Sequence, residues 1–279
     1  FAEEDAALEN KITGREVTQI LQQGLLGQKL RGAAPTEAGT ILGRSKAFSS
    51  IGAFQLNQAT QTRTTELAQQ SAVESVGEAM ANINEIARAI TGKEKVAICG
   101  YHGWHDWYLA ANIKSNKNLN SHLLKGLKSI GVPKKLKNSI YTFRMNNFKD
   151  FKKIENIKNL STVVMEVQRE KEPDINFLKY VRKFCNKNKI ILIFDECTSG
   201  FRETYGGIHM KYKIYPDLLV LGKALGNGYP ITSVLGKKKY LKKASKSFIS
   251  STFWTENSGF SAALKTLEII NKKKIFNSI

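Results

Sequence analysis

Two ionisable residues, Asp195 and Lys223, each follow a short apolar run. The run at 190–194 is uninterrupted and rich in β-branched residues, and the run at 218–221 repeats the pattern. Such runs are typical of strands in a parallel sheet whose two faces are covered by helices. Because ligands of open α/β sheets bind outside the carboxyl ends of the strands, the pattern predicts that Asp195 and Lys223 face one ligand.

An acid and a lysine at such an edge suit the chemistry of pyridoxal phosphate (PLP). A lysine amine forms a Schiff base with the aldehyde of this cofactor, and a carboxylate at the pyridine nitrogen keeps that nitrogen protonated, so that the ring accepts electrons from the substrate. Two residues alone leave simpler interpretations open, since Asp195 could cap a helix or a turn and Lys223 could be one of many surface lysines.

Two longer motifs surround the pair, DECTSGFR at 195–202 and PDLLVLGKALGNGYP at 216–230. They resemble the core of the class III aminotransferases of fold type I, which depend on PLP, in particular the glutamate-1-semialdehyde 2,1-aminomutase-like branch. The resemblance extends over roughly 78–267. It implies that Lys223 binds the cofactor and transfers a proton, that Asp195 contacts the ring nitrogen, and that Cys197 packs against one face of the ring.

The run from 95 to 100 predicts a further strand, and Tyr101 and His102 directly follow it. A tyrosine at a strand end can lie flat on a pyridine ring, and the resemblance implies that Tyr101 does so. A lone tyrosine that closes the core is the alternative. We interpret His102 as a structural or proton-relay residue next to the ring. No metal site is expected, because no cysteine or acid cluster accompanies His102 and His105.

Glu166 and Thr252 are expected at the margins of the same site. Glu166 ends a predicted strand at 160–165, and the resemblance implies that such a glutamate stands beside the cofactor or its neighbouring residues. The resemblance also implies that Thr252 donates a hydrogen bond to the cofactor phosphate of the other subunit, so that a homodimer shares its active sites. A threonine that caps the helix expected at 259–270 is the alternative.

A predicted amphipathic helix at 78–92 begins where the family binds the cofactor phosphate. There the family uses backbone N–H groups of a Gly-Ser or Gly-Thr pair together with the helix dipole. The corresponding letters here are Val76 and Gly77, so the hydroxyl is missing, although Ser75 lies close. Gly77 and Glu78 are therefore expected to contact the phosphate through the start of the helix.

The composition excludes several other classes of protein. At 279 residues the chain is long enough for a sizeable α/β core, and its apolar runs are far shorter than the ~20 residues of a membrane span. The N-terminus shows no signal-peptide pattern. Three cysteines, Cys99, Cys185 and Cys197, are too few and too scattered for a disulfide framework. We expect a cytoplasmic protein with reduced cysteines and no membrane partner.

The formal net charge of +19 raises the question of nucleic-acid binding. The excess lies beyond residue 92 and consists mainly of lysines that alternate with asparagine and isoleucine rather than with glycine or aromatic residues. No helix-turn-helix, zinc-finger or RNA-recognition signature accompanies them. We expect a solvated lysine-rich surface and no specific nucleic-acid partner.

A change in composition near residue 77 divides the chain. Residues 1–77 are rich in Ala, Gln, Thr and Gly and are predicted to form an atypical helical segment, including a polar helix at 56–75. Residues 78–279 alternate predicted strands and helices, which indicates an α/β fold with a mainly parallel sheet flanked by helices. The resemblance identifies 78–279 as the large, cofactor-binding domain of a fold type I PLP-transferase, without the C-terminal small domain.

The resemblance implies a PLP-dependent aminotransferase or aminomutase that acts on an amino acid, an amino-aldehyde or a sugar-linked amine. Arg202 and Glu166 offer charge near the cleft, but the residues that often select the substrate belong to the small domain. Substrate, amino donor and the choice between mutase and transaminase therefore stay open. The alternative is a non-catalytic fragment or an interaction protein that retains the fold, because closure of a small domain often completes such sites.

Overall fold

A single seven-stranded sheet organises the part of the chain that the computed structural model describes, which is residues 66–71, 76–122, 125–169, 171–244, 247, 249, 257–273 and 275–277. The strands lie in the order β1-β7-β6-β5-β4-β2-β3. β2 to β6 are parallel, whereas β7 pairs antiparallel with both β6 and β1. The strands are β1 (Glu66–Ser71), β2 (Lys95–Cys99), β3 (Ile140–Thr142), β4 (Leu160–Glu166), β5 (Ile191–Glu196), β6 (Leu218–Leu221) and β7 (Thr232–Lys237).

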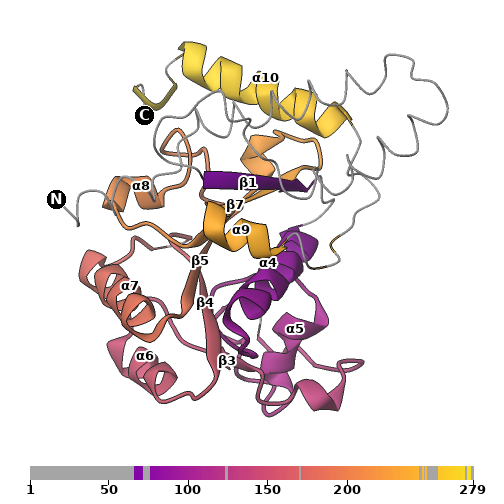
Figure 1. Ribbon diagram of the computed structural model, residues 1–279, viewed down its shortest axis with the longest axis vertical. Helices are drawn as coiled ribbons and strands as arrows, with labels where there is room; N and C mark the ends of the chain where they lie inside the picture. Colours follow the sequence, from indigo (N-terminus) through magenta and orange to yellow (C-terminus); the bar gives the residue numbers. More distant parts are fainter. Residues whose placement is uncertain are drawn as a thin grey trace.

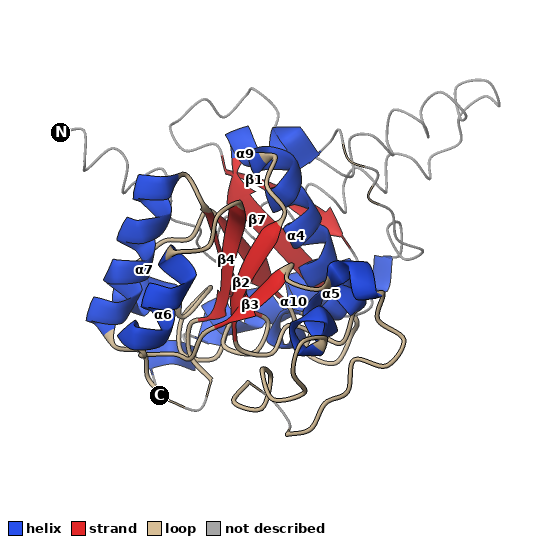
Figure 2. Cartoon of the chain, turned by 90° about the horizontal axis from the view of Figure 1, so that it is seen from below, coloured by secondary structure: helices blue, strands red, loops and turns tan. Residues whose placement is uncertain are grey.

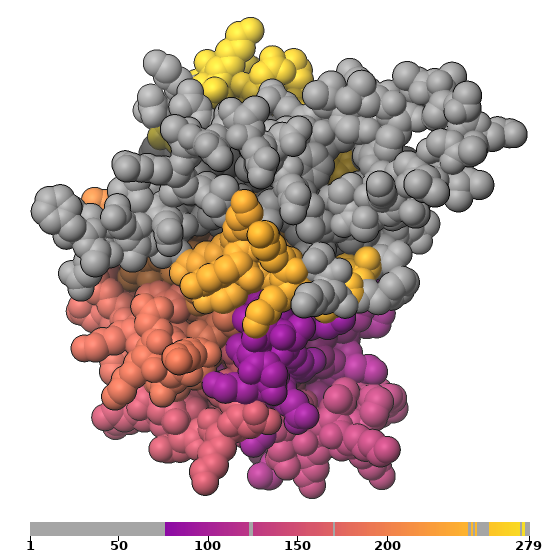
Figure 3. Space-filling model, in the orientation of Figure 1, coloured from indigo at the N-terminus to yellow at the C-terminus, as the bar shows by residue number. Residues whose placement is uncertain are grey.

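Helices cover both faces of the sheet (Figures 1 and 2). The α-helices of the described residues are α4 (Val76–Thr91), α5 (Asp106–Leu109), α6 (Phe148–Glu155), α7 (Ile175–Asn188), α8 (His209–Tyr212), α9 (Lys238–Ala244) and α10 (Asn257–Lys273). The 3-10 helices there are η1 (Ala110–Asn112), η2 (Lys134–Leu136), η3 (Lys223–Leu225) and η4 (Ile275–Asn277). α6 and α7 pack on one face, and α4, α5 and α9 on the other. Figure 3 shows α9 beside α4 on the surface.

The central strand β5 shows why its sequence is an uninterrupted apolar run. Leu192 and Phe194 belong to the core under α6 and α7, and Ile191 and Ile193 belong to the core under α4. Side chains alternate between the two faces of a strand, and here both faces are buried. The same alternation directs Asp195 to the α4 face.

Helix α7 leads the chain into β5 and has clear signals at both ends. The Asp174 side chain accepts a hydrogen bond from the Asn176 N–H group at 2.8 Å, which satisfies a free donor of the first turn. The helix ends at Lys189, whose φ of 52° lies in the left-handed region. Its buried side chains recur at helical spacing: Phe177, Leu178, Val181 and Cys185.

The expected α/β architecture with a mainly parallel sheet is confirmed. β2, β4, β5, β6, α4 and α10 occur within three residues of the predicted limits. The sequence did not predict β3 and α6, which lie in the polar, lysine-rich interval 110–153. β3 has three residues and α6 buries only two side chains, Phe151 and Ile154, so neither gives a strong periodic signal.

The predicted helix at 56–75 is wrong for 66–71, which form the edge strand β1. β1 pairs antiparallel with β7, from Glu66 opposite Lys237 to Ser71 opposite Thr232. Backbone pairing with the neighbouring strand, rather than the local glutamine-rich sequence, determines this conformation. Residues 1–65 and 72–75 of the predicted helical segment lie outside the described residues.

Two features bear on the surroundings of the protein. Cys99, Cys185 and Cys197 are all free and buried. Among the described residues, no helix is both long and apolar enough to cross a bilayer.

Candidate active site

The predicted site residues gather at the C-terminal edge of the sheet, which is the side where the carboxyl ends of four parallel strands lie. Asp195 in β5 lies opposite Val220 of β6, and Lys223 follows the end of β6. On the other side, Asp195 lies opposite Glu166, the last residue of β4. Tyr101 follows β2, which is the next strand beyond β4. The prediction that Asp195 and Lys223 come from the ends of strands is confirmed, and those strands are direct neighbours.

Asp195 is buried, with 3% of its surface exposed, and both of its carboxylate oxygens have partners. Oδ2 lies 2.8 Å from His102 Nδ1, and Oδ1 accepts a hydrogen bond from the Cys197 N–H group at 3.1 Å. A carboxylate only accepts hydrogen bonds, so His102 donates through Nδ1 when Asp195 is ionised. The other ring nitrogen, Nε2, is buried and has no hydrogen-bond partner among the described residues. His102 thus orients the carboxylate from β2, two strands away.

Lys223 has an unusual backbone conformation and a defined amine position. Its φ of 43° lies in the left-handed region, which costs a non-glycine residue roughly 1–2 kcal/mol. Its Nζ donates a hydrogen bond to Thr198 Oγ1 at 2.8 Å. Gly222, just before it, has little room for a side chain, because a Cβ there would lie 3.1 Å from Thr232 Cγ2 and 3.4 Å from Cys197 Sγ. Local strain of this kind is common at functional sites.

The Cys197 thiol is buried beneath this edge and is not a candidate nucleophile. Burial, followed by the charge of Asp195, raises the pKa of the Cys197 thiol well above its usual range. A thiol in such surroundings stays protonated near neutral pH, and a protonated thiol is a poor nucleophile. Its backbone N–H group donates a hydrogen bond to Asp195 Oδ1 at 3.1 Å, and its protonated thiol is also hydrogen-bonded to Asp195.

Tyr101 is held by its backbone and by neighbouring rings and charges. Its N–H group donates to Glu166 Oε2 at 3.0 Å, and Arg169 Nη1 lies 3.2 Å from the same oxygen. The Arg169 guanidinium carbon lies 5.8 Å from the centroid of the Tyr101 ring. Tyr108 meets that ring edge to face, with the centroids 5.8 Å apart. The ring therefore has a fixed orientation, and the sequence reasoning missed Arg169 as one of its neighbours.

Gly100 joins β2 to this cluster and leaves no space for a side chain. Its φ is +120°, and a Cβ there would lie 2.5 Å from Glu166 Oε2. Its N–H group donates to His122 Nδ1 at 2.9 Å, and its carbonyl accepts from the Tyr108 hydroxyl at 3.0 Å. Burial, followed by the charges of His102 and Arg144, lowers the pKa of His122 to about 4. His122 is therefore neutral near pH 7 and carries its hydrogen on Nε2.

Glu196 was not singled out from the sequence. It stabilises the loop after β5 from the face of the sheet opposite to that of Asp195. It is fully buried and accepts hydrogen bonds from the backbone N–H groups of Ile208 and His209. His209 Nδ1 lies 2.6 Å from its Oε1, and the Ser199 hydroxyl donates to its Oε2 at 3.3 Å. The neighbouring acids Asp195 and Glu196 thus serve opposite faces. The Asp-Glu dipeptide at a strand end was the signal that could have revealed this.

The first turn of α4 lies close to the loop after β2. Gly103 has a φ of +93°, and a Cβ there would lie 2.6 Å from Gly77 Cα. Only a glycine allows this contact between the two backbones. Glu78 lies in the same first turn and is half-buried. Thr252, predicted to contact the cofactor phosphate, lies outside the described residues.

Arg202, which the sequence reasoning placed near the cleft, is exposed and donates through Nε to the Thr198 carbonyl at 2.8 Å. It therefore supports the loop that carries Thr198, the partner of Lys223. Within the described part of the chain, no group of three or more His, Cys, Asp or Glu side chains is arranged to hold a metal ion.

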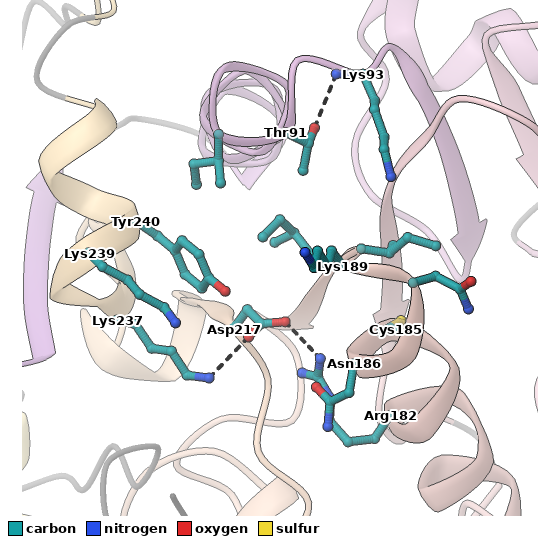
Figure 4. A pocket seen from close by; sticks show the side chains of 14 residues that line it. Thr91, Lys93, Arg182, Cys185, Asn186, Lys189, Asp217, Lys237, Lys239 and Tyr240 are labelled. Atoms are coloured by element: carbon teal, nitrogen blue, oxygen red, sulfur yellow. Dashed lines mark hydrogen bonds and ion pairs between the residues drawn. The ribbon is translucent and has the colours of Figure 1, made fainter.

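A cavity of about 620 Å³ lies on the other side of the sheet, near the beginnings of β5 and β6, and none of the predicted site residues lines it (Figure 4). Asp217 lies at the centre of its polar contacts. The Asp217 carboxylate accepts hydrogen bonds from Arg182 Nη2 at 2.9 Å, from Lys237 Nζ at 3.2 Å and from the Leu192 N–H group at 2.9 Å. Helices α4 and α7 end here, and lysines near helix C-termini are electrostatically favourable. This cavity thus has a structural explanation in the junction between α7 and the sheet.

Comparison with known proteins identifies the family. The sequence profile of the class-III aminotransferases matches residues 14–279, so the chain belongs to this family. A transaminase solved with PLP bound superposes with a TM-score of 0.62 at 19% identity, over 90% of this chain and 58% of that one. The fold is therefore that of the fold type I PLP-transferases.

Two curated relatives have different activities. The 3-aminobutyryl-CoA aminotransferase of Cloacimonas acidaminovorans is 36% identical over 206 residues, which are 70% of this chain and 45% of that protein. The glutamate-1-semialdehyde 2,1-aminomutase of Sulfolobus acidocaldarius is 32% identical over 201 residues, which are 68% of this chain and 46% of that protein. The chain thus spans about half the length of the curated relatives that it matches.

Replacement of His122 by asparagine is expected to remove a pH-dependent loss of stability. The unfolded chain binds a proton near the ordinary histidine pKa of 6.5, whereas the folded protein does so only at about 4. As the pH falls through this window, the unfolded state is protonated first. The free energy of unfolding therefore falls by up to about 3 kcal/mol more in the wild type than in the variant. Urea denaturation at a series of pH values measures this difference.

The asparagine Oδ1 can still accept the Gly100 N–H group, so the two proteins are expected to have similar stability above a pH of about 7. Parallel pH profiles for the two proteins would contradict a buried, neutral His122. So would a His122 ring signal in NMR that titrates near 6.5, the ordinary histidine value.

Proposed function

We propose that the chain is the cofactor-binding part of a PLP-dependent aminotransferase or aminomutase. One observation carries this proposal: the buried carboxylate of Asp195, oriented by His102, lies in the strand next to the one that delivers the Lys223 amine. Family membership supports it, and so does the match to a transaminase with PLP bound. PLP, when bound, supplies an aldehyde that condenses with amines and a ring that withdraws electrons from the carbon next to the substrate nitrogen.

The residues present fit this cofactor. Both carboxylate oxygens of Asp195 have a hydrogen-bond partner within the protein, and the carboxylate keeps further lone pairs that can accept the hydrogen of a protonated ring nitrogen. Lys223 presents a primary amine, and its contact with Thr198 fixes the starting position of that amine. Lys223 is also the group that accepts and returns the proton of the substrate carbon. The orphaned Nε2 of His102 offers a further polar contact beside the site.

The other predicted contacts complete the proposal. Tyr101 supplies an aromatic face beside the ring, and Glu166 fixes the Tyr101 backbone. Cys197 packs against the other face of the ring. Gly77 and Glu78, in the first turn of α4, offer backbone N–H groups to the phosphate, and the positive end of the helix dipole favours that charge. Thr252 is proposed to contribute its hydroxyl to the phosphate of the partner subunit.

The substrate is proposed to be a small amine or amino acid. The two named relatives are an aminotransferase and an aminomutase, so both reaction types stay within the proposal. Three buried free cysteines support a reducing compartment, and we propose the cytoplasm. The alternative of a non-catalytic protein with this fold has no specific observation in its favour.

Lys223→Ala is expected to abolish the visible absorbance that appears when PLP is added, and to reduce covalent retention of the cofactor after borohydride treatment to background. Lys187→Ala is the matched control, because it removes an exposed lysine on α7. Mass spectrometry of the reduced wild type is expected to find the cofactor on the peptide that contains Lys223. Retention unchanged in Lys223→Ala, or attachment at another lysine, would contradict the assignment. If an added amino acid removes the visible band, the non-catalytic alternative fails.

A two-fold dimer with shared sites is the proposed assembly, since the phosphate position at Val76 and Gly77 lacks the hydroxyl of the family. The net charge of +19 opposes association at low salt. Light scattering at moderate salt is expected to give a dimer mass with PLP present, and Thr252→Ala is expected to weaken cofactor binding. A monomer that binds PLP tightly and is indifferent to Thr252→Ala would rule the shared site out.

A further inference from the structure

A second cavity, of about 320 Å³, adjoins the candidate active site at the ends of β2 and β4. Gly100 and Glu166, which hold the Tyr101 backbone region in place, line one side of it. Volumes of this order accommodate the terminal group of a small molecule. The proposed function gives this space no role.

Cationic side chains dominate the lining. Arg144, Arg169 and Lys171 all border the cavity, whereas Glu166 is its single carboxylate. Glu166 is already engaged, because the Tyr101 N–H group and Arg169 both donate to its Oε2. Lys171 makes no ion pair with any residue that the structure describes. All three cationic side chains are exposed to solvent, and several cations around one recess attract an anion more strongly than one isolated lysine does.

Two neutral groups add hydrogen-bond donors to the same space. His122 lines the cavity, and its Nδ1 is already occupied by the Gly100 N–H group. Its remaining ring nitrogen therefore carries a hydrogen and can only donate while the ring is neutral. The hydroxyl of Ser121 is a further possible donor. The free polar groups of the lining are thus mainly donors, which suits a ligand group that has several acceptor oxygens.

A purely structural explanation covers part of this cluster. Arg144 donates through Nε to Asp150 Oδ2 at 2.6 Å, and Arg169 pairs with Glu166, so each arginine has a partner. These contacts leave the remaining guanidinium N–H groups of both arginines available. Among the described residues, the Lys171 amine, the Ser121 hydroxyl and Nε2 of His122 have no hydrogen-bond partner, whereas Nδ1 of His122 accepts from Gly100.

We propose that this cavity binds an oxyanion, either a carboxylate or a phosphate, carried by the substrate whose amine reacts at Lys223. This assignment rests on the proposed function. Its position follows from Arg169, which borders the cavity and also lies 5.8 Å from the ring of Tyr101. The substrate would therefore place its anionic end on the Tyr101 side of the site.

The first test measures anion binding through the His122 ring signal in NMR, which is identified by its absence in His122→Asn. Acetate and inorganic phosphate are titrated at constant ionic strength with PLP present, and a saturable shift of this signal is expected for at least one of them. The double variant Arg144→Gln/Lys171→Gln is expected to weaken the binding at least about tenfold, since two charged donors are lost. The preferred anion distinguishes a carboxylate from a phosphate.

A matched control removes the same amount of charge elsewhere. The control variant is Lys93→Gln/Lys239→Gln, because both lysines line the cavity of Figure 4, on the other side of the sheet. This variant is expected to leave the affinity for the anion unchanged. Equal weakening in both double variants would show general charge attraction and would overturn the proposal. The absence of a saturable His122 shift with either anion would also overturn it.

The second test links the anion to the substrate. β-Alanine and phosphoethanolamine carry an anionic group, whereas propylamine does not, and the loss of the visible band reports their reaction with the PLP-loaded protein. An anionic amine is expected to react at least about tenfold faster than propylamine, and only Arg144→Gln/Lys171→Gln is expected to reduce this preference. Equal rates for all three amines would contradict the substrate assignment. The absence of any visible band with PLP would instead contradict the proposed function, while the anion titration could still succeed.

Discussion

A buried carboxylate needs hydrogen-bond partners, and this requirement at Asp195 connects the parts of the candidate site. One partner, the Cys197 N–H group, comes from the turn that follows β5, whereas the other, His102, comes from the loop after β2. β4 lies between these two strands in the sheet. The contact between His102 and Asp195 therefore holds the loop after β2 against β5, across the intervening strand β4. It also restricts the orientation of Tyr101, which precedes His102 in this loop.

The loops at this edge are held by a series of specific contacts. Glu196 binds the loop after β5 from the face opposite Asp195, so the segment that carries Thr198 is anchored on both sides. Gly103 allows the loop after β2 to touch the first turn of α4 at Gly77. Because buried polar networks are costly when only partly satisfied, these contacts favour one arrangement of the edge. A preorganised edge of this kind is what a cofactor site requires.

Much of this arrangement follows from local sequence, and the remainder depends on contacts between distant residues. The central strands were predictable because both of their faces are buried, and the first polar residues after them marked the position of the candidate site. β1 was not predictable, since pairing with β7 gives a glutamine-rich segment its extended form. The contact of His122 with Gly100 spans 22 residues, and no spacing rule indicates it. The sequence did not indicate Arg169 as a site residue, because only the folded structure brings its guanidinium close to the Tyr101 ring.

The central claim is that Asp195, oriented by His102, keeps the ring nitrogen of the bound cofactor protonated. NMR of PLP labelled at its ring nitrogen and bound to the protein tests this claim most directly. The chemical shift is expected to be that of a protonated pyridine in the wild type and to move towards that of a neutral pyridine in Asp195→Asn. A neutral ring nitrogen in the wild type, or the same shift in both proteins, would contradict the role assigned to Asp195.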